Sequence, residues 1–284
     1  MKRKAFFIAE VSSNHNQDLQ RAISFIKVAK KIGCDAIKFQ LFQLQKLFSK
    51  EAIQSNKNLL KRSKWELPTQ FLPEIHRACK GEGIQFYCTP FDLESVKKLS
   101  DFVDGFKISS YELLWTQLYT ACLDFNLPTI GSVGMATLEE IENLNQKLNR
   151  YSNISFLHCV SEYPTPINNC NLNTIDTIRN LTNRPVGWSD HSRSPSVVIG
   201  AVLRHAASTV EFHLDLDCRG AEYSGGHCWL PSEISEVIQI CNESLEATGN
   251  SQKPILKSES EERVWRADPV DGLRPLKTFR NKLK

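Results

Sequence analysis

Two lysines occupy short apolar segments in which a charged side chain is unexpected. Lys38 lies in Ala-Ile-Lys-Phe-Gln and Lys107 in Gly-Phe-Lys-Ile-Ser. An ammonium group among apolar side chains is costly to bury unless an anion neutralises it. A solvent-facing position on an edge strand would explain one such lysine equally well. Two of them on separate strands, with hydroxyl residues nearby, favour a pocket that binds phosphate or carboxylate.

Two histidines form a second group that could do chemistry. His191 follows Ser-Asp, and His213 ends the segment Val-Glu-Phe-His. A single histidine is more often structural than a ligand, but two at the ends of neighbouring strands can face one ion, with Asp190 and Glu211 close by. Two imidazoles with oxygen ligands suit Mn²⁺ or another octahedral ion better than a closed zinc site. His227 could be a third ligand or a gate, although a structural role is the simpler expectation.

Eight short apolar runs, separated by amphipathic stretches, must position these residues. The runs are rich in β-branched and aromatic residues and fit buried parallel strands. Thr137 and Glu140 form a capping box that predicts the start of one intervening helix. Eight strands alternating with helices over about 250 residues are typical of a (β/α)8 TIM barrel, whereas a doubly wound sheet would offer a glycine-rich first turn. The predicted strands are residues 5–9, 36–40, 84–88, 105–109, 128–132, 154–159, 185–189 and 208–213.

The bulk composition limits the classes of partner. The 284 residues include 35 basic and 32 acidic side chains, and a net charge of +3 is too balanced to indicate a nucleic-acid partner. No apolar run is long enough for a signal peptide or a membrane span, so we expect a cytoplasmic protein without a membrane partner. The nine cysteines form no CxxC pairs and are expected to be reduced. The barrel is predicted to occupy residues 1–250, followed by a short C-terminal tail, 251–284, and no second domain.

Eight segments of the chain resemble the N-acetylneuraminate (sialic acid) synthase family. They occur in the family's order and cover residues 5–231, the whole predicted barrel. The resemblance implies a transferase that condenses phosphoenolpyruvate with an N-acetylmannosamine-type or related amino-sugar aldehyde. The products would be a nonulosonic acid and phosphate, formed by C–O cleavage at a divalent metal, Mn²⁺ in the first place and Mg²⁺ or Co²⁺ otherwise. The segments are FIAEVSSNHN, GCDAIKFQLF, FYCTPFDLESV, FKISSYEL, GSVGMATLEEIE, LHCVSEYPTP, VGWSDHS and VEFH.

The resemblance also implies roles for individual residues at the strand ends. His191 and His213 would hold the metal, which would polarise the aldehyde. Gln40 and Tyr163 would line the sugar end of the site. The catalytic residues would be Glu10, Glu112, Lys38 and Lys107. The residues that hold phosphoenolpyruvate together with the two lysines would be Thr89, Ser110, Ser132 and Ser189, and Ser161 follows the sixth predicted strand as a further substrate-binding candidate.

The chain departs from the family pattern in three places. The family's Ser-Thr-Gly-Met turn is Ser-Val-Gly-Met at residues 132–135, so one hydroxyl is missing. The family's Gly-Pro-Asp is replaced by a different loop, in which Glu222 is expected to supply the carboxylate. The family's C-terminal antifreeze-like domain, which contributes an arginine to the partner's sugar site, is expected to be missing, since only the tail 251–284 follows the predicted barrel. We therefore expect Arg274 of the tail to bond the sugar, and a homodimer remains an expectation.

Two other functions fit the same residues. A lysine in a barrel strand can form a Schiff base, so Lys38 or Lys107 could serve a metal-free aldolase. A non-catalytic barrel that binds a sugar or an anion is the second alternative. Trapping with borohydride and pyruvate would favour the aldolase, and inactivity with phosphoenolpyruvate on a broad panel of sugar aldehydes would favour the binding protein. The sequence does not identify the sugar.

Overall fold

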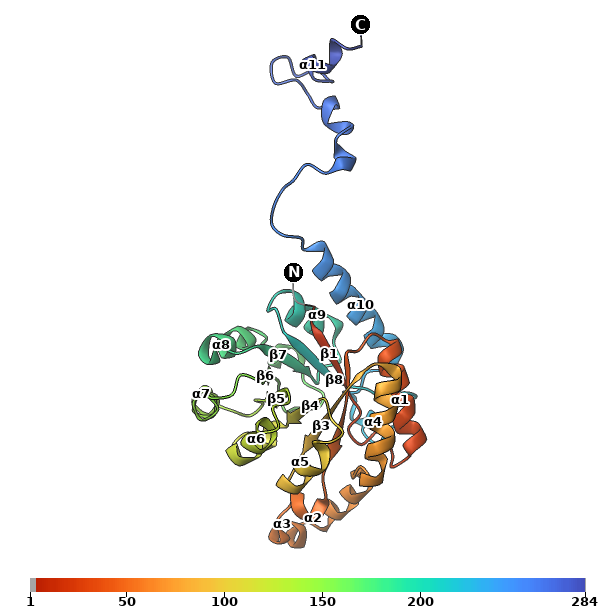
Figure 1. Cartoon of the computed structure of the whole chain (residues 1–284), viewed down its shortest axis with the longest axis vertical. Coiled ribbons are helices and arrows are strands. Elements are labelled where there is room, and N and C mark those ends of the chain that lie inside the picture. The colour runs from red at the N-terminus through yellow and green to blue at the C-terminus, as the bar shows by residue number, and fades with distance from the viewer. Residues whose placement is uncertain (1–3, 284) are drawn as a thin grey trace. The chain divides into compact units, whose positions relative to one another are not determined.

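The chain folds as a closed barrel of eight parallel strands surrounded by helices, which confirms the predicted TIM barrel (Figure 1). The computed structural model describes residues 4–283. Neighbours along the sequence are neighbours in the barrel, and β1 closes it by pairing with β8. Each strand overlaps one of the predicted runs. The strands are β1 (Phe6–Glu10), β2 (Ala36–Leu41), β3 (Gln85–Pro90), β4 (Gly105–Ile108), β5 (Thr129–Ser132), β6 (Ile154–His158), β7 (Val186–Asp190) and β8 (Thr209–His213).

The helices between the strands begin where the sequence offers caps. Asp18 accepts hydrogen bonds from the backbone of Gln20 and Arg21, and the capping box of Thr137 and Glu140 is present as predicted. The principal helices are α1 (Leu19–Lys31), α4 (Leu72–Glu82), α5 (Leu93–Leu99), α6 (Thr116–Leu123), α7 (Leu138–Lys147), α8 (Asn173–Thr182), α9 (Pro195–Leu203) and α10 (Pro231–Ala247). The excursion between β2 and α4 adds α2 (Leu44–Leu47), α3 (Lys50–Ser55) and the 3₁₀ helix Lys57–Trp65.

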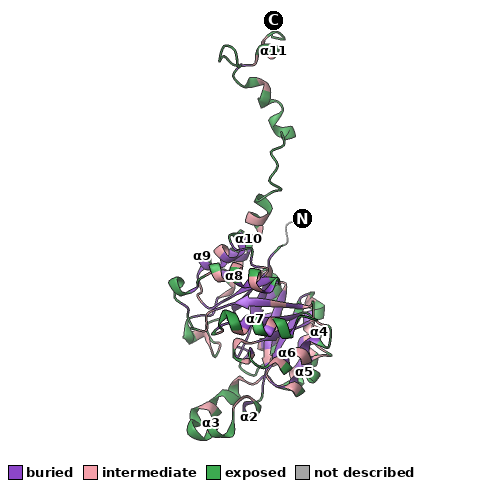
Figure 2. Ribbon diagram, turned by 90° about the vertical axis from the view of Figure 1, so that its left-hand side faces the viewer, coloured by how far each residue is buried: buried purple, intermediate pink, exposed green. Residues whose placement is uncertain are grey.

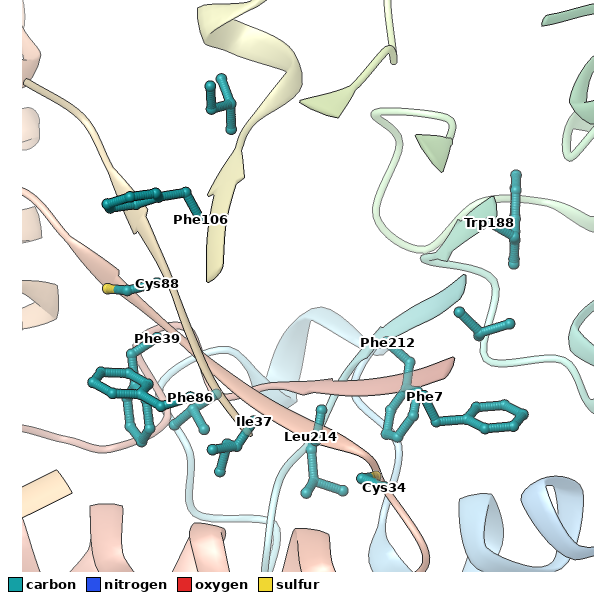
Figure 3. Packing of buried hydrophobic residues seen from close by; sticks show 14 of the residues in the cluster. Phe7, Cys34, Ile37, Phe39, Phe86, Cys88, Phe106, Trp188, Phe212 and Leu214 are labelled. Atoms are coloured by element: carbon teal, nitrogen blue, oxygen red, sulfur yellow. The ribbon is translucent and has the colours of Figure 1, made fainter. Parts of the chain in front are cut away.

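Alternation along each strand separates the hydrophobic core from the barrel interior. Large side chains such as Phe7, Phe39 and Trp188 point toward the surrounding helices and are fully buried there (Figure 3). Buried residues concentrate on the strands and on the inner faces of the helices (Figure 2). A second, smaller cluster consists of Ile8, Ala36, Tyr87, Ile130 and Leu157.

Residues of the smaller cluster lie two positions before polar residues near the carboxyl-terminal ends of their strands. Ile8 precedes Glu10, and Ala36 precedes Lys38, so each apolar residue and the polar one after it share the same face of the strand. The same step leads from Tyr87 toward the end of β3. The amino-terminal half of the barrel interior is therefore packed with apolar side chains, while the carboxyl-terminal half is polar, as expected where the loops of a TIM barrel carry its site.

The chain divides into two compact units, Met1–Leu245 and Glu246–Lys284. The second unit contains short helical turns that end with α11 (Lys277–Arg280). Within it the ring of Trp265 packs on Phe279, and the backbone N–H of Leu276 donates to the carbonyl of Val264. No helix in residues 4–283 is long and apolar enough to cross a membrane. All nine cysteines lie in the described chain as free thiols.

Candidate active site

A cavity of about 820 Å³ lies at the carboxyl-terminal ends of the strands. Every predicted site residue of the first unit lines it, and they come from all eight strands or the loops that follow them. Arg274 belongs to the second unit, so its contact with a sugar stays a prediction. The predicted residues that line the cavity are Glu10, Lys38, Gln40, Thr89, Lys107, Ser110, Glu112, Ser132, Ser161, Tyr163, Ser189, His191, His213 and Glu222.

Two lysines and two carboxylates form a buried charged cluster in this cavity. Nζ of Lys38 lies 2.7 Å from Oε2 of Glu10 and 3.8 Å from Oε1 of Glu211. Nζ of Lys107 lies 3.6 Å from the same oxygen of Glu211. All four residues are at most 4% exposed. Carboxylates of the protein therefore lie beside both lysines, which the apolar pattern around them did not reveal.

The two lysines differ in how well they are neutralised. Burial lowers the pKa of Lys38, but Glu10 and Glu211 outweigh burial and raise it above the ordinary value. Burial dominates at Lys107 and lowers its pKa, because the opposing effect of Glu211 is smaller and the charge of Lys38 lowers the pKa further. The one hydrogen bond of Lys107 among residues 4–283 is a long one, 3.4 Å, to the carbonyl of Ile108. Lys107 is therefore the cation with the most to gain from a bound anion.

Hydroxyl groups surround the lysines. Thr89 accepts a hydrogen bond from Lys38 over 3.2 Å, and Ser189 donates to Glu211 over 3.4 Å. The hydroxyl of Ser132 is buried without a hydrogen-bond partner in the described part of the chain. We expect a ligand or a water molecule to bind this hydroxyl, since buried polar atoms are normally hydrogen-bonded.

Gly134 keeps a small polar recess open beside these hydroxyls. Its backbone N–H donates to Oγ of Ser110 over 2.9 Å. A Cβ at this position would lie 2.6 Å from Oγ of Ser161 and 2.8 Å from Sγ of Cys159, so any side chain would fill the space that these groups face. Ser110 and Ser161, both predicted substrate contacts, therefore meet at one glycine.

His191 and His213 are brought together as predicted. Their ring centroids lie 5.6 Å apart. Nδ1 of His191 contacts the carbonyl of Val160 at 2.6 Å, and Nδ1 of His213 contacts Oε2 of Glu222 at 2.9 Å. With Nδ1 donating to an acceptor, Nε2 of each ring is the nitrogen left for a ligand, the usual arrangement around metal-binding histidines. The donor set therefore fits a divalent metal.

The electrostatic surroundings of the two imidazoles differ. Burial lowers the pKa of His191 to about 3, so its ring is neutral and carries a lone pair at physiological pH. Burial would also lower the pKa of His213, but its contact with Glu222 raises it. Burial opposes ionisation of Glu222, yet His213 and His227 hold its pKa well below the ordinary value. The hydroxyls of Ser12 and Ser13 add hydrogen bonds of 2.5 and 3.1 Å to this carboxylate.

The residues predicted for the sugar end and the reacting carbons lie beside these groups. Gln40 donates to Oε1 of Glu10 over 2.6 Å, and the Tyr163 ring lies 4.0 Å from that of His191. Burial raises the pKa of Glu112, whose Oε2 is buried without a partner in the described chain. Glu112 is therefore suited to carry a proton at a pH where other glutamates are ionised.

Several cavity residues were not predicted. The 3₁₀ helix Lys57–Trp65 supplies Arg62 and Trp65, and the guanidinium of Arg62 lies 5.2 Å from the Trp65 ring and 5.5 Å from that of Phe48. These residues do not end a strand, so the strand-end rule does not find them. The signal that the sequence offered was a basic residue, Arg62, with the aromatic residues Phe48 and Trp65 on either side of it along the chain.

The carboxylate of Asp190 lies away from the metal-binding histidines, whereas His227 lies beside them. Asp190 was expected to accompany the metal-binding histidines, but its two oxygens accept hydrogen bonds from the indoles of Trp188 and Trp229, at 3.1 and 2.9 Å. It anchors the core beneath β7 and does not line the cavity. His227 is buried, lines the cavity and lies 4.7 Å from His213 between ring centroids.

Comparisons with known proteins relate this chain to one family. The NeuB family model matches residues 25–253. The chain is 31% identical over 272 residues to the N,N'-diacetyllegionaminic acid synthase of Campylobacter jejuni, covering 90% of this chain and 81% of that protein. It is 33% identical over 232 residues to a pseudaminic acid synthase of the same species, covering 76% and 66%.

Solved structures show the same relationship. The N-acetylneuraminic acid synthetase of Leptospira borgpetersenii, crystallised with citrate, superposes with a TM-score of 0.81 at 28% identity and covers 92% of this chain and 90% of its own. A truncated 3-deoxy-D-arabino-heptulosonate 7-phosphate synthase of Thermotoga maritima superposes with a TM-score of 0.67 over 86% of this chain and 88% of its own. Its identity is 15%, so this second likeness concerns the fold alone.

Proposed function

Because the chain belongs to the NeuB family of phosphoenolpyruvate-dependent nonulosonic acid synthases, we propose that it joins phosphoenolpyruvate to the aldehyde of an N-acetylmannosamine-type or related amino sugar. The observation that carries this proposal is the position of Lys107. It is a buried, incompletely neutralised cation, and it lines the same cavity as the paired imidazoles of His191 and His213. One cavity thus offers a site for an anion beside a site for a metal.

Phosphoenolpyruvate carries a phosphate and a carboxylate, and both suit the lysine cluster. Lys38 and Lys107 would bind them by charge-assisted hydrogen bonds, which are about twice as strong as neutral ones. The unpaired hydroxyl of Ser132 and the hydroxyl of Ser110 would complete the contacts. Binding the two anionic groups at separate points fixes the orientation of C3, the carbon that must attack the aldehyde.

The bonds change as follows in the proposed reaction. C3 of phosphoenolpyruvate bonds to the aldehyde carbon, and the aldehyde oxygen becomes a hydroxyl. Water adds its oxygen to C2, and the bond between C2 and the bridging oxygen breaks, so that phosphate leaves with that oxygen and C2 becomes a ketone. Nε2 of His191 and His213 would hold a divalent ion, for which we propose Mn²⁺, and this ion supplies Lewis-acid polarisation of the aldehyde.

Protein side chains would manage the protons and the sugar. Glu112, whose pKa burial raises, suits the role of donor to the aldehyde oxygen. Glu10 is fixed by Lys38 and by Gln40, so its carboxylate is held at one position near the reacting carbons. Tyr163 packs on the ring of His191 and would contact the sugar beside the metal.

A Schiff-base aldolase remains the alternative enzyme, and Lys107 is its best nucleophile. Burial lowers the pKa of Lys107, which favours the neutral amine, whereas the pKa of Lys38 is raised by its two carboxylates. Borohydride with pyruvate should leave the mass of the protein unchanged under our proposal. A covalent adduct that disappears in Lys107→Met would support the aldolase instead.

Phosphate release tests the proposed function. The purified chain is incubated with phosphoenolpyruvate, Mn²⁺ and a panel of aldoses that includes N-acetylmannosamine and diacetamido-trideoxyhexoses, and products are identified by mass. We expect phosphate release that depends on one aldose and gives a product larger by a pyruvate unit. Inactivity across the panel, with metal bound and the protein folded, would favour a non-catalytic binding barrel.

A further inference from the structure

The loop after β8 returns to the strand that it leaves. The backbone N–H of Asp215 donates to the carbonyl of Trp229 over 2.9 Å, and that of Trp229 donates to the carbonyl of His213 over 2.8 Å. Leu214 and Trp229 form a parallel β-bridge. Residues 227 and 228, directly before this bridge, are therefore held beside His213 by backbone contacts that do not depend on their own side chains.

A buried amide fixes the middle of the same loop. Oδ1 of Asn14 accepts a hydrogen bond from the backbone N–H of Glu222 over 2.8 Å. Its Nδ2 donates to the carbonyl of Leu214 over 2.9 Å and to Sγ of Cys228 over 3.5 Å. Asn14 is fully buried, so it links the loop to the turn after β1 at a position shielded from solvent. Glu222 and Cys228 are thus placed by one side chain.

Four potential metal ligands converge at this point. Oε2 of Glu222 lies 2.9 Å from Nδ1 of His213 and 3.6 Å from Nε2 of His227. Ligand atoms of these three residues and of Cys228 all lie within 4.8 Å of one another. Zinc bonds of about 2.0–2.3 Å in a tetrahedron place ligand atoms roughly 3.3–3.7 Å apart. The separation of 3.6 Å falls within that range, the separation of 2.9 Å is shorter, and the longest, up to 4.8 Å, would need to shorten by about 1 Å.

His227 lacks a satisfactory partner in the hydrogen-bond network of residues 4–283. It is 6% exposed, and its Nδ1 is buried without a partner. Its Nε2 contact with Glu222 is longer than the 2.7–3.2 Å of an N–H···O hydrogen bond. An ion between the imidazole of His227 and the carboxylate of Glu222 would replace this long contact with two short bonds.

This group differs in kind from the pair formed by His191 and His213. The pair supplies two imidazoles and leaves coordination positions for substrate and water, as catalytic metal sites do. The group of four offers two imidazoles, a carboxylate and a thiol, which fill a tetrahedral ion completely, as structural sites do. His213 belongs to both, through Nε2 in the pair and through Nδ1 in the group, where the bond to the ion would replace the proton that Nδ1 shares with Glu222. Ions on both nitrogens at once would make the ring a bridging imidazolate.

We propose that His213, Glu222, His227 and Cys228 form a closed site for a thiophilic divalent ion, of which Zn²⁺ is the natural example. The thiolate of Cys228 sets this chemistry apart from the oxygen-rich environment that Mn²⁺ prefers. The bound ion ties the loop between His213 and Trp229 to the end of β8 and fixes the orientation of the His213 ring. The site stands on its own geometry and does not depend on the proposed reaction.

Cobalt is the probe that tests the site, because Co²⁺ replaces Zn²⁺ and absorbs visible light. The full-length, reduced protein is titrated with Co²⁺ under nitrogen. We expect a thiolate-to-cobalt charge-transfer band in the near ultraviolet and intense visible bands of four-coordinate Co²⁺, both abolished by added Zn²⁺. Cys228→Ser should remove the charge-transfer band. His191→Ala should retain it, since His191 is not part of the group.

Two results would overturn the proposal. One is a wild-type protein that binds Co²⁺ without a charge-transfer band, and the other is a band that persists in Cys228→Ser. If Cys228→Ser does not fold, as judged by circular dichroism, His227→Gln decides. It should weaken Co²⁺ binding by about tenfold or more while the band remains. An unchanged affinity in His227→Gln would contradict the site even if phosphate release from phosphoenolpyruvate is observed.

Discussion

Oε1 of Glu211 lies 3.6 Å from Nζ of Lys107, and both side chains are buried in the barrel. The same oxygen lies 3.8 Å from Nζ of Lys38. Glu211 therefore stands between the two lysines and holds part of their charge while no anion is bound. An anionic substrate would share these cations with Glu211. This carboxylate therefore affects both the stability of the fold and the binding of the anion.

Glu211→Gln should destabilise the protein strongly at neutral pH. Removing one member of a buried ion pair leaves the other charge unpaired, and the cost is about 3–5 kcal/mol. Urea unfolding followed by circular dichroism measures the change in the free energy of unfolding. Glu94→Gln is the matched control, because Glu94 also contacts a lysine, Lys46, but at the surface, and it should change stability little. Equal effects of the two substitutions would contradict the role of Glu211.

Lys107→Met should raise the KM for phosphoenolpyruvate and lower kcat. The lost charge-assisted bonds serve both the bound substrate and the transition state, and each is worth about 1.5–3 kcal/mol, or roughly ten- to hundredfold in kcat/KM. Steady-state phosphate release gives both constants. Lys98→Met, which removes a surface lysine paired with Glu94, should leave them unchanged. An unaltered KM in Lys107→Met would refute the anion site.

Glu112→Gln should alter the pH dependence of stability. Burial raises the folded-state pKa of Glu112 above the ordinary value of 4.5. As pH rises through 4.5 the unfolded chain loses its proton first, so the protonated carboxyl stabilises the fold below 4.5 and this contribution is lost as pH rises through the folded pKa.

The variant should therefore match the wild type in acid and exceed it at neutral pH by about 1 kcal/mol, since it removes a buried, unpaired carboxylate oxygen. Urea unfolding at several pH values measures this difference. Glu236→Gln, on an exposed position of α10, serves as the control and should show no such trend. A constant difference between Glu112→Gln and wild type at all pH values would show that Glu112 is not perturbed.

His191→Ala should abolish turnover and leave the barrel folded. A divalent ion held by two protein imidazoles loses much of its binding when one is removed. His191 follows the last residue of β7, so its side chain is not part of the sheet. Turnover at the Mn²⁺ concentration that saturates the wild type measures the first effect, and the circular dichroism spectrum measures the second. Wild-type rates that survive exhaustive chelation would rule out the metal requirement.

The alternation of the strands explains why much of the site could be predicted. A period of two fixes which residues of a buried strand face the barrel, so Lys38, Lys107 and Ser132 had to share the interior once the strands were recognised. The histidines followed for the same reason, because β7 and β8 are neighbours in the closed barrel.

The rest depends on contacts that no local pattern encodes. Arg62 and Trp65 reach the cavity from an excursion whose path is set by tertiary packing. The meeting of Glu222 and His227 depends on a loop that Asn14, more than 200 residues away, holds in place. Asp190 was misjudged because its neighbours in sequence, and not the indoles that bind it, suggested its role.

The fate of one oxygen atom tests the proposed synthase most directly. Phosphoenolpyruvate labelled with ¹⁸O at the oxygen between C2 and phosphorus is incubated with the protein, Mn²⁺ and the aldose panel, and phosphate and the carbon product are analysed by mass. We predict that the label appears in phosphate, together with a new product that contains the aldose and three further carbons. Label retained in pyruvate or in the carbon product, or phosphate released without a new carbon–carbon bond, would contradict the account.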